Sequence, residues 1–172
     1  MARKTSEKYQ KIGIDTSVLV NLIIKDIDLF KFKEKEFSIN DAIYYAMKTK
    51  YEFKGVILNK YGFNKKEKNK LWRRVKNSLG LKPIKIGKRN ISQYLGRVRE
   101  ANSLLIKQGH ATKYPTACII GEEDIEIIAN FLKWGITKIY TSDRAFYETC
   151  KAIGLKSELI LIPEYSQMIK RP

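Results

Sequence analysis

Two short apolar runs in this sequence end on an aspartate that stands beside hydroxyl residues. The first is "KIGIDTS", with Asp15, and the second is "TKIYTSD", with Asp143. Each run is typical of a buried strand, and ligand sites of parallel sheets lie at the carboxyl ends of the strands. Two carboxylates in close proximity repel each other unless a cation neutralises them. Because carboxylate oxygens suit Mg²⁺ or Mn²⁺, the pair indicates a divalent-metal site.

Two further acids could belong to the same site. Asp124 lies in the first turn of a helix predicted from "EEDIEIIANFLKWG", where Glu122 and Glu123 are its rivals. Glu52 lies in mid-helix, where capping does not explain it, although a pair with a nearby lysine would. Acids at helix starts are favoured by the macrodipole and by capping, so for Asp15, Asp124 and Asp143, each taken alone, a structural role is the favoured interpretation. Spacing alone leaves both interpretations open.

The elements that would position these acids alternate between short strands and helices. Strands are expected at 11–14, 36–39, 137–143 and 155–163, and helices at 17–30, 41–60, 65–80, 91–109, 122–135 and 143–154. Asn40 or Asp41 is expected to cap the second helix. Residues 81–90 are expected to be a basic connection. This order predicts an α/β domain with a mostly parallel sheet.

Composition indicates one soluble, cytoplasmic domain over residues 1–172. Of these residues 44% are hydrophobic, enough for a real core, and no apolar stretch approaches the roughly 20 residues that span a bilayer. The N-terminus "MARKTSEKYQK" lacks the apolar segment of a signal peptide. Cys118 and Cys150 fit neither a disulfide framework nor a zinc motif, so both are expected to be buried as small hydrophobic residues.

Positive charge is concentrated in one segment. The formal net charge is +16, and residues 60–99 hold fourteen Lys or Arg and one acid, Glu67. Such a block favours a polyanion, and nucleic acid fits best, although a solubilising surface is the alternative. The helices at about 60–109 could form a basic insertion or subdomain. The candidate nucleic-acid contacts are Lys65, Lys66, Lys68, Lys70, Arg73, Arg74, Lys76, Lys88 and Arg89.

Two other side chains in or near this segment could contact nucleic acid. Trp72 could stack on a base, but packing beside Leu71 and Val75 in the core is the favoured interpretation. His110, the only histidine, is expected to be solvated in a loop and is given no role.

The combined motifs resemble the PIN-domain family of metal-dependent ribonucleases, which includes VapC-like toxins. "IGIDTSVLV" resembles the opening strand and turn of that family, and "YEF" at Glu52 its helical glutamate. Asp124 opens a helix that ends at Gly135, and "YTSDRAF" resembles the final strand and turn. The resemblance covers almost the whole chain. Asp41 remains a rival to Glu52.

The resemblance implies a three-layer α/β/α fold and a specific chemistry. Asp15, Glu52, Asp124 and Asp143 would bind one or two Mg²⁺ or Mn²⁺, with Thr16, Thr141 and Ser142 in support. The expected reaction is hydrolysis of phosphodiester bonds in single-stranded RNA, giving 5′-phosphate and 3′-hydroxyl products. The protein would be a toxin with an antitoxin partner or an RNA-processing nuclease, with a homodimer as a further expectation. The alternative is an RNA-binding module without catalysis.

Overall fold

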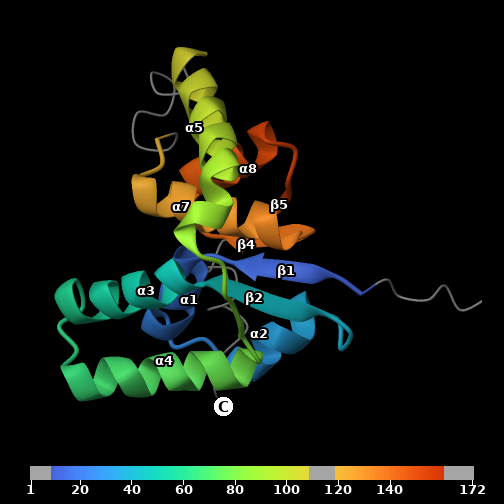
Figure 1. Cartoon of the computed structure of the whole chain (residues 1–172). Coiled ribbons are helices and arrows are strands. Elements are labelled where there is room, and N and C mark those ends of the chain that lie inside the picture. Colours follow the sequence, from blue (N-terminus) through green and yellow to red (C-terminus); the bar gives the residue numbers. More distant parts are fainter. Residues whose placement is uncertain (1–8, 109–118, 161–172) are drawn as a thin grey trace, which may run out of the picture.

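A five-stranded sheet, parallel throughout, organises the computed structural model, which describes residues 9–108 and 119–160 (Figure 1). Its order is β3-β2-β1-β4-β5. The strands are β1 (Lys11–Ile14), β2 (Ala42–Ala46), β3 (Lys82–Ile84), β4 (Lys138–Thr141) and β5 (Lys156–Leu159). Ile12 of β1 pairs with Ile43 of β2 on one side and with Lys138 of β4 on the other. The predicted α/β class with a mostly parallel sheet is therefore confirmed.

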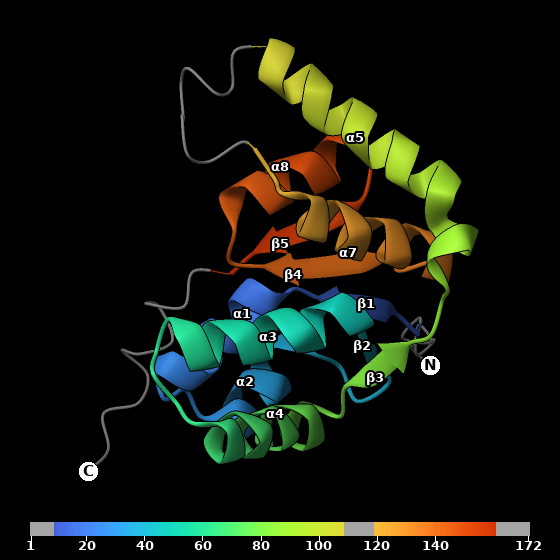
Figure 2. The ribbon, with the colours of Figure 1, turned by 60° about the vertical axis from the view of Figure 1, so that its left-hand side comes forward.

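Helices cover both faces of the sheet, so the molecule has three layers (Figure 2). One layer holds α1 (Thr16–Ile24), α2 (Leu29–Glu36), α3 (Met47–Asn59) and α4 (Lys65–Leu79). The other holds α5 (Ser92–Lys107), α7 (Glu122–Trp134) and α8 (Arg144–Ala152), and a short 3-10 helix, Lys88–Ile91, precedes α5. Among the described helices, none is long and apolar enough to cross a membrane.

The central strand β1 contributes to the cores on both faces of the sheet. Ile12 and Ile14 are buried in the core beneath α1 to α4, while Gly13 faces the core beneath α7. A Cβ atom at Gly13 would lie 3.0 Å from the Phe131 ring, which is itself fully buried. Glycine at this position therefore lets α7 approach the strand closely.

The helix predicted over residues 17–30 is two helices. Asp26 has φ 49°, and the Asp28 side chain accepts hydrogen bonds from the backbone N–H groups of Phe30 and Lys31. Aspartate tolerates the left-handed conformation and is a strong N-cap, so α1 ends before it and α2 begins after it. The continuous apolar pattern concealed this break.

The second strand lies later in the chain than predicted. Residues 36–39 do not form a strand, and the predicted helix over 41–60 is β2 followed by α3. The segment "AIYYA" of β2 is buried on both faces, so it lacks the alternation that separates strand from helix. Asp41 therefore caps no helix; its carboxylate accepts from the Ser38 backbone N–H. Asn40 likewise precedes a strand.

Residues 60–108 contribute to both helical layers and to the sheet. The basic helix predicted over 65–80 is confirmed as α4, with Gly80 in the left-handed conformation after its end. The predicted connection at 81–90 was wrong in part, because β3 adds an edge strand there. That this segment is an insertion or subdomain remains a prediction. Gly109, His110 and Cys118 lie outside the described residues, and Cys150 is buried as predicted.

Candidate active site

The four acids singled out from the sequence line one cavity of about 300 Å³. Asp15 follows β1 and Asp143 follows β4, while Glu52 comes from α3 and Asp124 from α7. The cavity lies at the carboxyl edge of the sheet because both flanking strands are parallel and end there. Its other polar lining residues are Thr16, Ser17, Asn21, Lys60 and Tyr61.

Asp15 is a helix cap and a buried carboxylate at once. It is only 2% exposed, and its side chain accepts from the Thr16 backbone N–H at 2.6 Å. The other oxygen accepts from the Ser17 hydroxyl at 2.6 Å and from the Thr141 hydroxyl at 3.0 Å. Burial raises the pKa of Asp15 above its usual value, whereas these three donors lower it. The donors thus favour the ionised form and fix its orientation.

Ser17 connects the ends of β1 and β4, and it was not among the site residues predicted from the sequence. Its hydroxyl accepts from the Ser142 backbone N–H at 2.9 Å while donating to Asp15. Thr141 contacts Asp15 as expected, but the Ser142 hydroxyl donates to the Ile160 carbonyl instead. The signal for Ser17 was present in "DTS", since a hydroxyl two residues after an N-cap aspartate can reach back to it.

Asp143 caps α8 at the end of the neighbouring strand β4. Its carboxylate accepts from the Phe146 backbone N–H at 2.9 Å, and its own backbone N–H donates to the Thr141 hydroxyl at 3.0 Å. Thr141 therefore contacts both strand-end aspartates. The structural and the metal-binding interpretations of these residues are compatible, because capping uses only part of each carboxylate.

Asp124, rather than either neighbouring glutamate, lines the cavity. Its carboxylate accepts from the Gly121 backbone N–H at 3.3 Å. Burial, followed by repulsion from Asp15, Glu52 and Asp143, raises the pKa of Asp124 to about 7. The two rivals form ion pairs elsewhere: Glu122 with Arg99 at 2.7 Å, and Glu123 with Lys48 at 2.8 Å.

Glu52 lines the cavity, and its rival Asp41 does not. The Glu52 carboxylate accepts from the Thr16 hydroxyl at 2.5 Å. Burial is the main cause that raises the pKa of Glu52, and the charges of Asp15 and Glu123 add to it. Asp41 precedes β2 and therefore lies at the amino edge of the sheet.

The donor set suits a divalent cation. Four carboxylates line one cavity and repel one another. A bound Mg²⁺ or Mn²⁺ would neutralise their charge and remove this repulsion. Among the described residues, no three acidic, histidine or cysteine side chains are grouped closely enough to hold one ion as they stand. Binding through three of the carboxylates would therefore require their side chains to approach one another.

The basic residues of α4 surround a buried structural face. Trp72 is 4% exposed, with its ring 5.0 Å from that of Tyr45 and 5.4 Å from that of Phe53. The core interpretation of Trp72 is confirmed, and base stacking by it is excluded. Five of the candidate cations are exposed, and Lys68 and Lys76 are half-buried. Those five are Lys65, Lys66, Lys70, Arg73 and Arg74. The side chains of Lys88 and Arg89 lie outside the described part of the structure.

Comparison with known proteins finds similarity in structure alone. No protein-family model and no curated protein matches the chain. It is similar to VapBC-1 from nontypeable Haemophilus influenzae, with a TM-score of 0.59 and 15% identity over 87% of this chain and 97% of that chain. It is also similar to VapBC2 from Rickettsia felis in a structure with a DNA fragment from the promoter of these proteins. The TM-score is 0.60, with 17% identity over 87% of this chain and 98% of that chain. The PIN-like fold implied by "IGIDTSVLV" and "YTSDRAF" is therefore confirmed: this chain has the fold found in VapBC structures.

Proposed function

We propose that this protein is a metal-dependent endoribonuclease. It would hydrolyse phosphodiester bonds of single-stranded RNA with Mg²⁺ or Mn²⁺, giving 5′-phosphate and 3′-hydroxyl products. The observation that carries this proposal is the convergence of Asp15, Glu52, Asp124 and Asp143, from four different elements, on one cavity. Capping accounts for Asp15 and Asp143 at this edge of the sheet, but it does not account for Glu52, which lies inside α3 and caps no helix.

Each acid has a role in this proposal. Asp15 and Asp143 are direct metal ligands, and Glu52 and Asp124 act as ligands directly or through water. A bound divalent ion would supply a water of lowered pKa and would stabilise charge on the phosphate. The Ser17 and Thr141 hydroxyls favour the ionised form of Asp15 and fix its orientation, and Thr16 orients Glu52.

The basic surface of α4 supplies the attraction that the acidic cavity cannot. Lysines and arginines that neutralise phosphates release condensed counterions, which favours RNA binding. Arg74 lies only 3.9 Å from Asp26, so part of its charge is already compensated within the protein. The exposed cations elsewhere on α4 are better placed to contact RNA.

Two biological roles fit this chemistry: the toxin of a toxin–antitoxin pair and an RNA-processing nuclease. The likeness to VapBC structures supports an antitoxin partner, and a homodimer would be compatible with either role. A neighbouring gene for a short DNA-binding protein would favour the toxin. The alternative function is an RNA-binding module without catalysis. The four acids that line one cavity favour the enzyme, since a module that had lost its metal would not need to keep them.

The decisive assay incubates the protein with single-stranded RNA and Mn²⁺, with and without EDTA. We expect internal cleavage with Mn²⁺ and none with EDTA. Product ends are then typed with a ligase that requires a 5′-phosphate. RNA that is bound but uncut under every condition would overturn the enzyme and leave the binding module. Calorimetric titration with Mn²⁺ in the absence of RNA tests the metal separately.

A further inference from the structure

The side of α3 that faces the acidic cavity carries a cation at each end. Lys48, Glu52, Val56 and Lys60 are spaced four residues apart, so they follow one another along one face of the helix. Glu52, Val56 and Lys60 line the cavity. The rise of a helix places Lys48 and Lys60 about 18 Å apart along its axis. A strand of RNA lying along this face would therefore cross an acid flanked by two cations.

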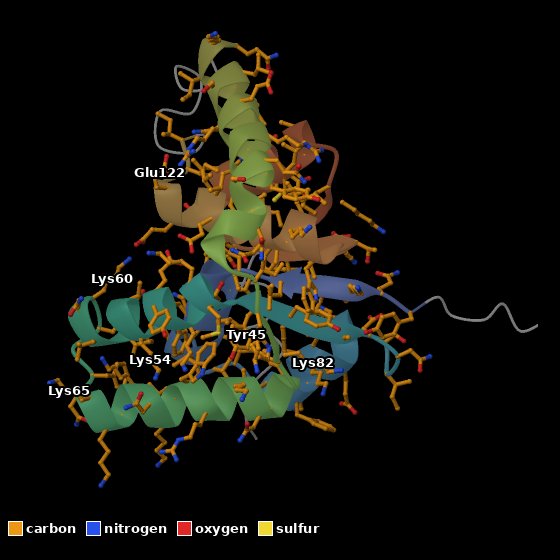
Figure 3. The ribbon with its side chains drawn as sticks, viewed as in Figure 1. Tyr45, Lys54, Lys60, Lys65, Lys82 and Glu122 are labelled. Carbon is orange, nitrogen blue, oxygen red and sulfur yellow. The ribbon has the colours of Figure 1, made fainter. Side chains whose placement is uncertain are left out.

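Only one of these two cations is available to a ligand. The Lys48 ammonium is 2.8 Å from the Glu123 carboxylate, so its charge is already paired. Lys60 is exposed, and it is the only cation among the described residues that line the cavity. Figure 3 shows it at the end of α3, near Lys65 at the start of α4. Lys60 can thus hold a phosphate group that the four carboxylates would repel.

Tyr61 places an aromatic ring next to this cation. It lies two residues after the end of α3, is 37% exposed and also lines the cavity. The Lys60 ammonium lies 5.7 Å from the centre of its ring. The ring is accessible in a way that Trp72 and Tyr45 are not, because both of those are buried. An exposed aromatic ring beside a cation offers a stacking surface and a phosphate contact together.

We propose that Lys60 and Tyr61 form a nucleotide subsite at the rim of the acidic cavity. Lys60 binds a phosphate next to the one that is cut, and Tyr61 stacks on an unpaired base beside it. This inference rests on the proposed nuclease function and specifies its substrate. A base in a duplex already stacks on its neighbours and is not free to stack on Tyr61, so the subsite selects single-stranded RNA.

Binding of a short fluorescent single-stranded RNA in EDTA tests the subsite without cleavage. Lys60→Gln is compared with Lys54→Gln, which removes the same charge from the same helix on the side facing α4 (Figure 3). We expect Lys60→Gln to weaken RNA binding by about threefold or more. The slope of log affinity against log salt concentration should become shallower by about 0.7. Lys54→Gln should change the affinity and the slope clearly less. Equal effects of the two variants would overturn the subsite, because they would show that only net charge matters.

The ring is tested with a matched pair at position 61. Tyr61→Leu should weaken binding by about fivefold or more, while Tyr61→Phe retains wild-type affinity. Tyr61→Leu should also reduce the preference for single-stranded over duplex RNA. If Tyr61→Leu bound RNA with wild-type affinity and kept the preference for single-stranded RNA, the proposal that Tyr61 stacks on a base would be wrong. Melting temperatures of all variants establish that the comparison is between folded proteins.

Cleavage with Mn²⁺ separates this inference from the function on which it rests. Lys60→Gln should raise KM while kcat stays within about twofold, because the subsite contributes binding and not chemistry. A wild-type protein that cuts RNA, with Lys60→Gln kinetics unchanged, would contradict the subsite and leave the nuclease intact. A wild-type protein that neither binds nor cuts RNA would contradict both.

Discussion

The acidic cavity and the basic surface of α4 are organised in opposite ways. Asp15 is buried and accepts three short hydrogen bonds, and Thr141 joins it to Asp143 across two strands. The cations of α4 are mostly exposed side chains without comparable partners among the described residues. Chemistry at the cavity should therefore depend on individual atoms. Attraction by α4 should depend on summed charge and on salt.

The sharpest test of this comparison is Asp15→Asn. The change keeps the shape of the side chain and removes the charge of a proposed metal ligand, so we expect RNA cleavage to fall at least about 100-fold. RNA binding should be retained, because the loss of a negative charge can only reduce repulsion of the phosphates in the cavity. The control is Glu34→Gln, which removes one charge from an exposed position on α2. Full activity of Asp15→Asn in a gel-based cleavage assay would remove Asp15 from the site.

Trp72→Ala tests whether the inner face of α4 is structural. Removing a buried ring of this size should lower the free energy of unfolding by about 3–5 kcal/mol. Thermal denaturation should show a melting temperature lower by about 6–20 °C, since 1 kcal/mol shifts a protein of this size by about 2–4 °C. At a temperature where the variant is folded, RNA affinity should be unchanged. Lost affinity with a normal melting temperature would contradict this division of roles.

Asp124 makes the metal-free stability depend on pH. Its pKa is about 7 in the folded protein, against a usual value of 3.8. Between these values the unfolded chain ionises while the folded protein keeps its proton, so stability falls as pH rises from about 4 to 7. The free energy of unfolding falls by at most about 4 kcal/mol from this group, and the decrease levels off above pH 7.

Melting temperatures measured across this range should fall with pH in the wild type and less so in Asp124→Asn. Added Mn²⁺ should raise the melting temperature more at pH 8 than at pH 5, because it binds ionised carboxylates. A Mn²⁺ effect that is equal at both pH values would argue against binding in the cavity.

Ser17→Ala probes the support of the site. The variant removes the hydroxyl that donates to Asp15 and accepts from Ser142, so we expect kcat to fall by about 10- to 100-fold. Ser103→Ala, on the exposed side of α5, is the matched control. If Mn²⁺ affinity fell together with kcat, the hydroxyl would act on catalysis by supporting metal binding. If Ser17→Ala retained wild-type kcat and wild-type Mn²⁺ affinity, the hydrogen bond from Ser17 to Asp15 would be structural only.

Patterns that depend on neighbouring residues were readable from the sequence. "IGIDTS" and "IYTSD" each combine a buried strand with a capping aspartate, so they predicted both the strands and the edge at which the acids meet. Glycine stops predicted the ends of α4 and α7, and both Gly80 and Gly135 adopt left-handed conformations. Local steric and hydrogen-bonding preferences are sufficient for such features.

Features that depend on the folded environment were not readable. The segment "AIYYA" was assigned to a helix because a strand buried on both faces has no alternating pattern. Ser17 was missed as a support because its partner Ser142 is 125 residues away. The resemblance already favoured Asp124 over Glu122 and Glu123 through its distance to Gly135, but the ion pairs of the two glutamates with Arg99 and Lys48 are seen only in the structure.

A crystal structure of the protein soaked in Mn²⁺ tests the central claim most directly. We predict an anomalous peak in the cavity, with carboxylate oxygens of Asp15 and Asp143 about 2.0–2.3 Å from the ion. Glu52 and Asp124 should contact the same ion or its waters. An empty cavity at saturating Mn²⁺, or an ion bound only elsewhere, would contradict the account and reduce the four acids to helix caps and surface charges.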